Sequence, residues 1–169
     1  MESQGSAGFT IISNKKVFIF FRWLAAIFAA LVLIDLIFSV LPGSLADISK
    51  GHIMAFTGGI GLGILFILPV NYFHYDDSYE ILHLRSKSLW SLGTDLHKRF
   101  DFPKRKVTDY QIKGGGPFKS LWLTLDNYAS DSQKVRKLGI FMITEEQLAA
   151  LIDSLERMKA RNKANLSHD

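Results

Sequence analysis

A basic cluster is the densest set of side chains in this sequence that could bind a ligand. Its members, Lys98, Arg99, Lys104, Arg105 and Lys106, stand on either side of a short Phe-Asp-Phe-Pro segment. Near a membrane, such charges attract anionic lipid headgroups by about 1 kcal/mol each, and they also suit an anionic nucleotide. A solvated strand edge is the alternative, because lysine prevents edge-to-edge pairing of sheets. The neighbouring aromatics alternate toward a core, which disfavours nucleic acid as a partner.

Patterns of catalytic residues are absent from the sequence. It has no Gly-x-Ser-x-Gly motif and no cysteine, and its five histidines are not spaced as a His-x-x-x-His metal pair. The Gly114–Gly116 triplet lies between Lys113 and Lys119, but it lacks the spacing of a phosphate-binding loop and is more typical of a hairpin turn. We therefore expect no enzyme activity, no metal site and no cofactor.

Two apolar stretches dominate the first part of the chain. They run from about Val17 to Leu41 and from Ile53 to Phe73, and a helix needs about 20 residues to cross a bilayer. The sequence therefore predicts a polar leader over 1–15, and a transmembrane hairpin over 16–73 with a short turn at Pro42–His52. The partner of these helices would be the lipid bilayer.

The distribution of basic residues predicts the orientation of this hairpin. Lys15, Lys16 and Arg22 flank the start of the first span, whereas Lys50 alone lies in the connecting turn. Because basic residues favour the cytoplasmic side, we expect both termini in the cytoplasm of a bacterial cell, with the helices in its inner membrane.

Asp35 is the one acidic residue within the first span. An unpaired carboxylate costs several kcal/mol inside a bilayer, so it needs a partner or water. One interpretation is an ion or proton relay, or a polar lock between subunits. The other is that Asp35 reaches the interface, or pairs with Thr57 or with the connecting loop.

The second apolar stretch carries small residues at a spacing of four. Ala55, Gly59 and Gly63 share one helical face, the pattern that lets two helix backbones approach closely in lipid. The contact is either with the first helix or with another subunit. We expect self-association or binding to another membrane protein.

The remaining sequence, 74–161, shows the pattern of a β domain followed by a helix. Apolar residues alternate with polar ones in about six short segments separated by turn residues, which predicts antiparallel strands. Thr144 and Gln147 then form a capping box. An apolar stripe follows it at helical spacing, and residues 162–169 read as a flexible tail. The stripe consists of Leu148, Leu151, Ile152, Leu155 and Met158.

The order of these elements predicts an α+β membrane protein. Its soluble part resembles the bacterial pleckstrin-homology-like (PH-like) domains found in small membrane proteins. The segments that carry the resemblance are Tyr79–Leu89, Lys98–Val107, Tyr110–Lys113, Ser120–Leu125, Val135–Ile143 and Thr144–Lys159. The resemblance implies seven strands, one more than the pattern predicts. Eukaryotic relatives of that fold bind phosphoinositides, and the bacterial ones look more like assembly and protein-contact modules.

Two functions follow as hypotheses. The first is a non-enzymatic accessory or scaffold protein that anchors a cytoplasmic PH-like domain and assembles through its membrane helices. The second is an oligomeric, ligand-gated effector whose basic domain binds an anionic nucleotide, such as a cyclic oligonucleotide, and which then permeabilises the membrane. The second hypothesis would explain Asp35, the small-residue face and the basic cluster together.

Overall fold

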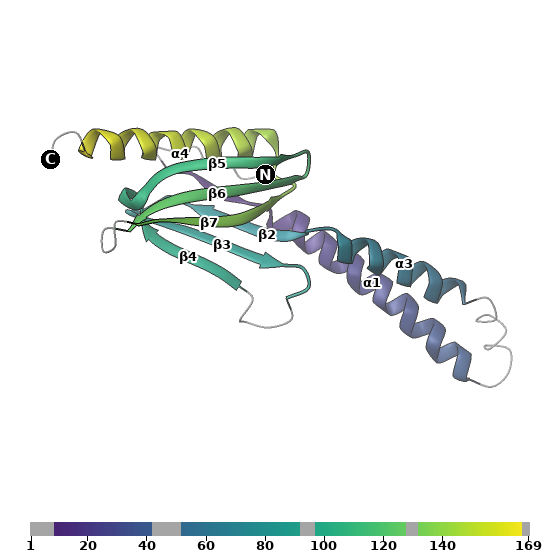
Figure 1. Ribbon diagram of the computed structural model, residues 1–169. Coiled ribbons are helices and arrows are strands. Elements are labelled where there is room, and N and C mark those ends of the chain that lie inside the picture. The colour runs from purple at the N-terminus through teal and green to yellow at the C-terminus, as the bar shows by residue number, and fades with distance from the viewer. Residues whose placement is uncertain (1–8, 42–51, 92–96, 128–131, 167–169) are drawn as a thin grey trace. The chain divides into compact units, whose positions relative to one another are not determined.

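The computed structural model describes residues 9–41, 52–91, 97–127 and 132–166, and it divides the chain into two compact units. One unit combines the residues up to Lys15 with those from Asn71 onward, and the other comprises Lys16–Val70. Most of the predicted turns at 42–52, 91–95 and 126–132 lie outside the described residues. Figure 1 shows the elements of both units.

Two antiparallel sheets form the larger unit. The first has the order β1-β2-β3-β4, from Ile11–Ser13, Asn71–Asp76, Ile81–Ser88 and His97–Pro103. A 3-10 turn, η2 (Lys104–Lys106), leads to the second sheet, β5-β6-β7, from Val107–Gly115, Phe118–Asn127 and Ser132–Phe141. The prediction of an α+β chain with antiparallel strands is confirmed.

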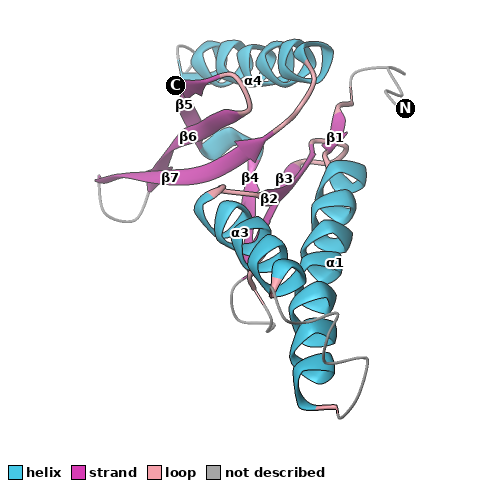
Figure 2. Ribbon diagram, turned by 90° about the vertical axis from the view of Figure 1, so that its right-hand side faces the viewer, coloured by secondary structure: helices cyan, strands magenta, loops and turns pink. Residues whose placement is uncertain are grey.

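Helix α4 (Glu145–Leu166) lies along β5 (Figures 1 and 2) and begins with the predicted capping box. The Thr144 amide donates to Gln147 Oε1 at 3.1 Å, and the Gln147 amide donates to Thr144 Oγ1 at 3.2 Å. Leu151, Leu155 and other side chains of the predicted stripe enter the core, but Ile152 is 37% exposed. The core is made of Ile12, Phe73, Tyr75, Leu82, Leu84, Phe102, Val107, Leu121, Leu123, Leu125, Leu138, Ile140, Ile143, Leu151, Leu155 and Met158.

The predicted flexible tail is wrong over 162–166, because α4 continues through Leu166. The Asn162 side-chain amide anchors this part of the helix by donating to the carbonyls of Lys104 at 2.9 Å and Val107 at 2.7 Å. Residues 167–169 of the predicted tail lie outside the described part of the chain.

The predicted leader and the predicted domain boundary also differ from the structure. Ile11–Ser13 is a strand, β1, and it pairs with Asp76 through His74 of β2. The β unit resumes at Asn71 rather than at residue 74. The described residues thus contain seven strands where the pattern predicted about six. The β unit is assembled from two segments that are separated in sequence by the whole helical unit.

Asn14 joins these two segments through its buried side chain. Its Nδ2 donates to the carbonyls of Asn71 and Phe141, each at 2.8 Å, and its Oδ1 accepts from the Phe73 amide at 2.7 Å. Because charge-neutral buried polar groups need such partners, Asn14 holds together the end of β1, the start of β2 and the end of β7.

The helical unit contains α1 (Lys15–Val40) and α3 (Ile53–Ile67). Among the described helices, only α1 is long and apolar enough to cross a bilayer. The predicted second helix is wrong in its extent, since it ends at Ile67 instead of Phe73. Pro69 explains this end, because a proline disfavours the helical conformation in the residue before it, and Leu68 is extended with φ −71° and ψ 126°.

Candidate anion-binding groove

The five residues of the predicted basic cluster do not form one patch. Lys98 and Arg99 lie toward the start of β4, where they face Ser86 and Arg85 of β3, whereas the other three form η2 beyond the end of β4. At about 3.3 Å per residue, the strand separates Lys98 from Lys104 by about 20 Å. Lys104 has a structural role, since its ammonium donates to the Asp77 carbonyl.

A groove in the β unit brings two of the predicted residues together with two others. Arg99 and Lys106 line it from the β4 side, and Lys134 and Arg136 line it from β7. Its volume is about 290 Å³. The remaining lining residues are Phe100, Asp101, Phe102, Leu125 and Asp126. We call this site, with its four basic residues, the β4–β7 groove.

Asp101 is already engaged within the β4–β7 groove. Its carboxylate pairs with Arg99 Nε and with His83 Nδ1, each at 2.6 Å. The hydrogen bond from His83, followed by the contacts with Arg99, lowers the pKa of Asp101 from its usual value. Asp101 is therefore ionised at neutral pH, and it neutralises part of the charge on Arg99 and orients its guanidinium.

The three basic residues of the groove other than Arg99 are more available to a ligand. The Arg136 guanidinium lies 5.3 Å from the centre of the Phe100 ring, a cation–π contact that leaves its N–H groups free to donate. Lys106 and Lys134 have no ion-pair partner within the described ranges. With four basic and two acidic lining residues, the groove carries a net charge of +2. This arrangement can bind a compact anionic group.

Lys134 and Arg136 were missed by the sequence reasoning. They stand about thirty residues beyond the predicted cluster in the sequence. Only the folded arrangement of the strands places them in the same groove as Arg99 and Lys106. Their spacing of two on a strand was the signal available, because it places both side chains on one face.

Asp35 has a partner that sequence reasoning did not single out. Its carboxylate is 2.9 Å from Nδ1 of His52, and Asp35 is 2% exposed whereas the His52 side chain is 65% exposed. His52 directly precedes α3. The interpretation that Asp35 pairs with the end of the connecting loop therefore holds.

The close contact between α1 and α3 uses a different glycine face from the predicted one. A Cβ on Gly58 would lie 2.6 Å from the Phe28 carbonyl oxygen, and one on Gly61 would lie 2.6 Å from the Phe28 ring. By contrast, a Cβ on Gly59 or Gly63 would meet nothing within 4 Å. Among the described residues, the predicted face is therefore open at Gly59 and Gly63, while Ala55 is half-buried.

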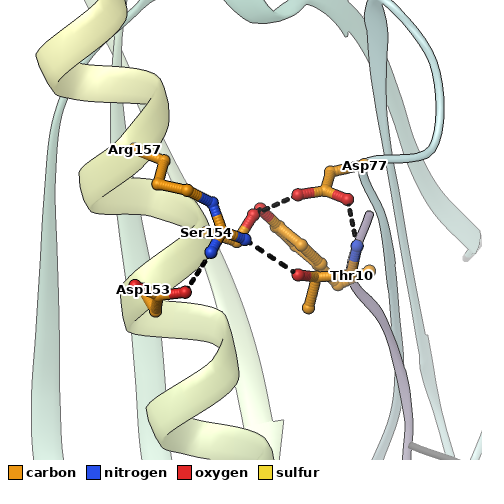
Figure 3. Close-up of polar contacts among 6 residues, drawn as sticks. Thr10, Asp77, Asp153, Ser154 and Arg157 are labelled. Carbon is orange, nitrogen blue, oxygen red and sulfur yellow. Dashed lines mark hydrogen bonds and ion pairs between the residues drawn. The ribbon is translucent and has the colours of Figure 1, made fainter. Parts of the chain in front are cut away.

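A second polar cluster fastens α4 to the β unit (Figure 3). Ser154 bridges two buried groups: its hydroxyl donates to the Asp77 carboxylate and lies 2.7 Å from the Tyr75 hydroxyl. Asp77 also accepts from the Thr10 amide just before β1. Burial raises the pKa of Tyr75, although the hydrogen bond with Ser154 acts in the opposite direction. These groups are mutually satisfied, which indicates a structural role.

Comparisons with known proteins add no family to this description: no protein-family model, no curated protein and no solved structure matches the chain. Within the described residues, no group of three or more His, Asp or Glu side chains is placed to hold a metal ion.

Proposed function

We propose that this chain is a non-enzymatic accessory or scaffold protein of the bacterial inner membrane, in which two helices anchor a cytoplasmic PH-like domain. The observation that carries the proposal is the exposure of α1. Its most apolar window has a mean hydropathy of 2.6, yet only 6% of that window is buried. A helix of a soluble core would be mostly buried, so the apolar surface of α1 calls for lipid around it.

The position of β1 supports a retained anchor rather than a removable signal segment. β1 precedes α1 in the chain and pairs with β2. Cleavage after α1 would remove this strand from the sheet together with the hydrogen bonds of Asn14. The β unit is therefore complete only when α1 stays attached.

The shorter α3 can also cross a bilayer if the residues after it contribute. Its 15 residues span about 22 Å, and the non-helical segment Leu68–Val70 adds up to about 10 Å. The sum approaches the hydrocarbon thickness of about 30 Å. Leu68 and Pro69 would then lie near the headgroups, where water can satisfy the irregular backbone.

Seven strands in two sheets, closed by a C-terminal helix, support the PH-like resemblance. The strand number is the one that the resemblance implies, and α4 occupies the end of the chain. An assembly role is favoured because, of the predicted face of Ala55, Gly59 and Gly63, both glycines are open in the described part of the chain. In lipid, such a face is available to a helix of another subunit or of another membrane protein.

Leucine substitutions test this assembly role. We expect Gly59→Leu combined with Gly63→Leu to abolish cross-linked oligomers in native membranes while the chain stays folded, because a Cβ at either position meets nothing within 4 Å among the described residues. The amount of oligomer after chemical cross-linking is the measurement, and resistance to alkaline carbonate extraction verifies the anchor.

Gly58→Leu is the matched control on the same helix. It would clash with the Phe28 carbonyl, so we expect it to destabilise the helix pair rather than to act on assembly alone. Unchanged cross-linking in the Gly59/Gly63 variant would refute assembly through this face. Extraction of the unmodified chain by carbonate would refute the membrane anchor.

The ligand-gated effector is the second candidate, and the Asp35–His52 contact and the β4–β7 groove favour it. Dye release from liposomes that contain the full chain, on addition of cyclic oligonucleotides, is the test. The full chain is required because a fragment starting at Asp76 would lack β1 and nearly all of β2. Absence of release at saturating nucleotide would refute this candidate.

A further inference from the structure

Two sheet edges border the β4–β7 groove. β4 is the last strand of the first sheet and β7 is the last strand of the second. Along β7, every residue from Gln133 to Lys137 is exposed, so both faces of this stretch are open to water. An edge strand presents N–H and C=O groups that point away from its sheet, and these groups can pair with an additional strand.

The charges of the β4–β7 groove determine which strand can be added. Lys134 and Arg136 project from β7 into the groove, and Arg99 and Lys106 lie on the opposite side. A second copy of β7 would bring like charges together, which is unfavourable across paired strands. An acidic strand would instead pair its carboxylates with these side chains.

We propose that the β4–β7 groove binds an extended acidic segment of a partner protein, which adds to β7 as a further strand. The proposal deepens the scaffold function and rests on it, because it supplies the contact through which the anchored domain would hold a partner. β7 is favoured over β4 as the pairing edge, since β4 ends in Pro103, which has no N–H to donate.

The alternation of β7 also specifies the sequence pattern of the partner. Lys134 and Arg136 face the groove, whereas Val135 between them lies on the other face and is 54% exposed. A strand with acidic residues at every second position would meet the two cations, and aliphatic residues between them would cover Val135. The open groove of about 290 Å³ suits a few side chains of such a segment, being slightly smaller than most pockets that enclose small molecules.

Fluorescence anisotropy with the full chain in nanodiscs tests the proposal. The probe is a short labelled peptide of alternating glutamate and valine. We expect saturable binding, and we expect Arg136→Glu to raise the Kd by about tenfold or more because it replaces attraction with repulsion. The charge-matched control Lys163→Glu, on an exposed position of α4, should leave the Kd within about twofold.

A second peptide distinguishes strand addition from charge attraction alone. N-methylation of alternate amides preserves every carboxylate but removes the N–H groups that would pair with β7, so we expect it to weaken binding by about tenfold. Equal binding of the methylated peptide, an equal effect of Lys163→Glu, or displacement of the peptide by equimolar inorganic phosphate would each overturn the proposal.

The same samples separate this inference from the scaffold function. An anchored, carbonate-resistant chain that binds no peptide would refute the peptide site and leave the anchor standing. A chain that binds the peptide but is extracted by carbonate would refute the anchor and retain the groove.

Discussion

His74 on β2 shows how a single half-buried side chain can make the β unit sensitive to pH. Its Nδ1 is buried and has no hydrogen-bond partner in the described part of the chain, and its ring stacks on Tyr72 with centroids 6.3 Å apart. Burial lowers the pKa of His74 below 6.5, although nearby Asp76 acts in the opposite direction. The folded chain therefore favours the neutral imidazole.

From this shift we predict that stability falls as the pH decreases below about 6.5. In that range the unfolded chain binds a proton at position 74 that the folded chain resists, so the free energy of unfolding decreases with decreasing pH. The slope from one histidine stays below about 1.4 kcal/mol per pH unit, and solvent screening reduces it further. Denaturant unfolding at pH 7.5 and pH 5.5 measures the effect.

His74→Phe is the informative variant, because it retains the ring beside Tyr72 and cannot titrate. Its loss of stability between the two pH values should be smaller than that of the unmodified chain. An identical loss in both proteins would assign the pH dependence to other groups.

At the scale of elements, the attachment of α4 depends on the Ser154 bridge. Tyr75 is fully buried and Asp77 is 3% exposed, and the Ser154 hydroxyl is a hydrogen-bond partner of both. A buried polar group that loses its partner costs about 1–3 kcal/mol. The helix is thus held by polar contacts as well as by its apolar stripe.

We therefore predict that Ser154→Ala lowers the free energy of unfolding by about 2 kcal/mol. Ser120→Ala serves as the control, because that exposed hydroxyl makes a longer bond of 3.3 Å to the Lys113 carbonyl, and its loss should change stability by less than about 0.5 kcal/mol. Urea denaturation followed by tryptophan fluorescence measures both variants. Equal changes in the free energy of unfolding would show that the Ser154 bridge contributes no more to stability than the exposed Ser120 hydrogen bond does.

Elements with local signals were predictable from the sequence, and elements that depend on distant pairing were not. The capping box at Thr144 and Gln147 is contained in four consecutive residues, and it was confirmed. β1 has three residues, too few to show alternation, and its partner strand begins at Asn71. Likewise, Lys134 and Arg136 of β7 line the β4–β7 groove only because the folded sheets place them there.

At the scale of the whole molecule, the β unit consists of two chain segments with the helical unit inserted between them. The ends of the insertion are close, because Asn14 Nδ2 lies 2.8 Å from the Asn71 carbonyl oxygen. A short linker can therefore bridge them. Sequence reasoning placed the boundary at residue 74 because apolar Phe73 resembles the end of a membrane helix as much as it resembles a core strand.

This topology predicts how fragments behave. A fragment of residues 71–169 lacks β1 and Asn14 and should be unstable, whereas residues 9–14 joined to 71–169 by a short glycine-serine linker should fold as a water-soluble domain. Thermal unfolding monitored by circular dichroism compares the two. A cooperative transition at the same temperature in both fragments would show that β1 and Asn14 contribute little.

The discontinuous β unit also sets an order of events during synthesis. β1 leaves the ribosome before α1, and its partner β2 follows only after the entire helical unit has been made. At about 5–20 residues per second, that interval lasts several seconds. The β1–β2 pair therefore cannot form until both helices have been synthesised, so the helical unit is complete in every newly made copy before the first sheet can close.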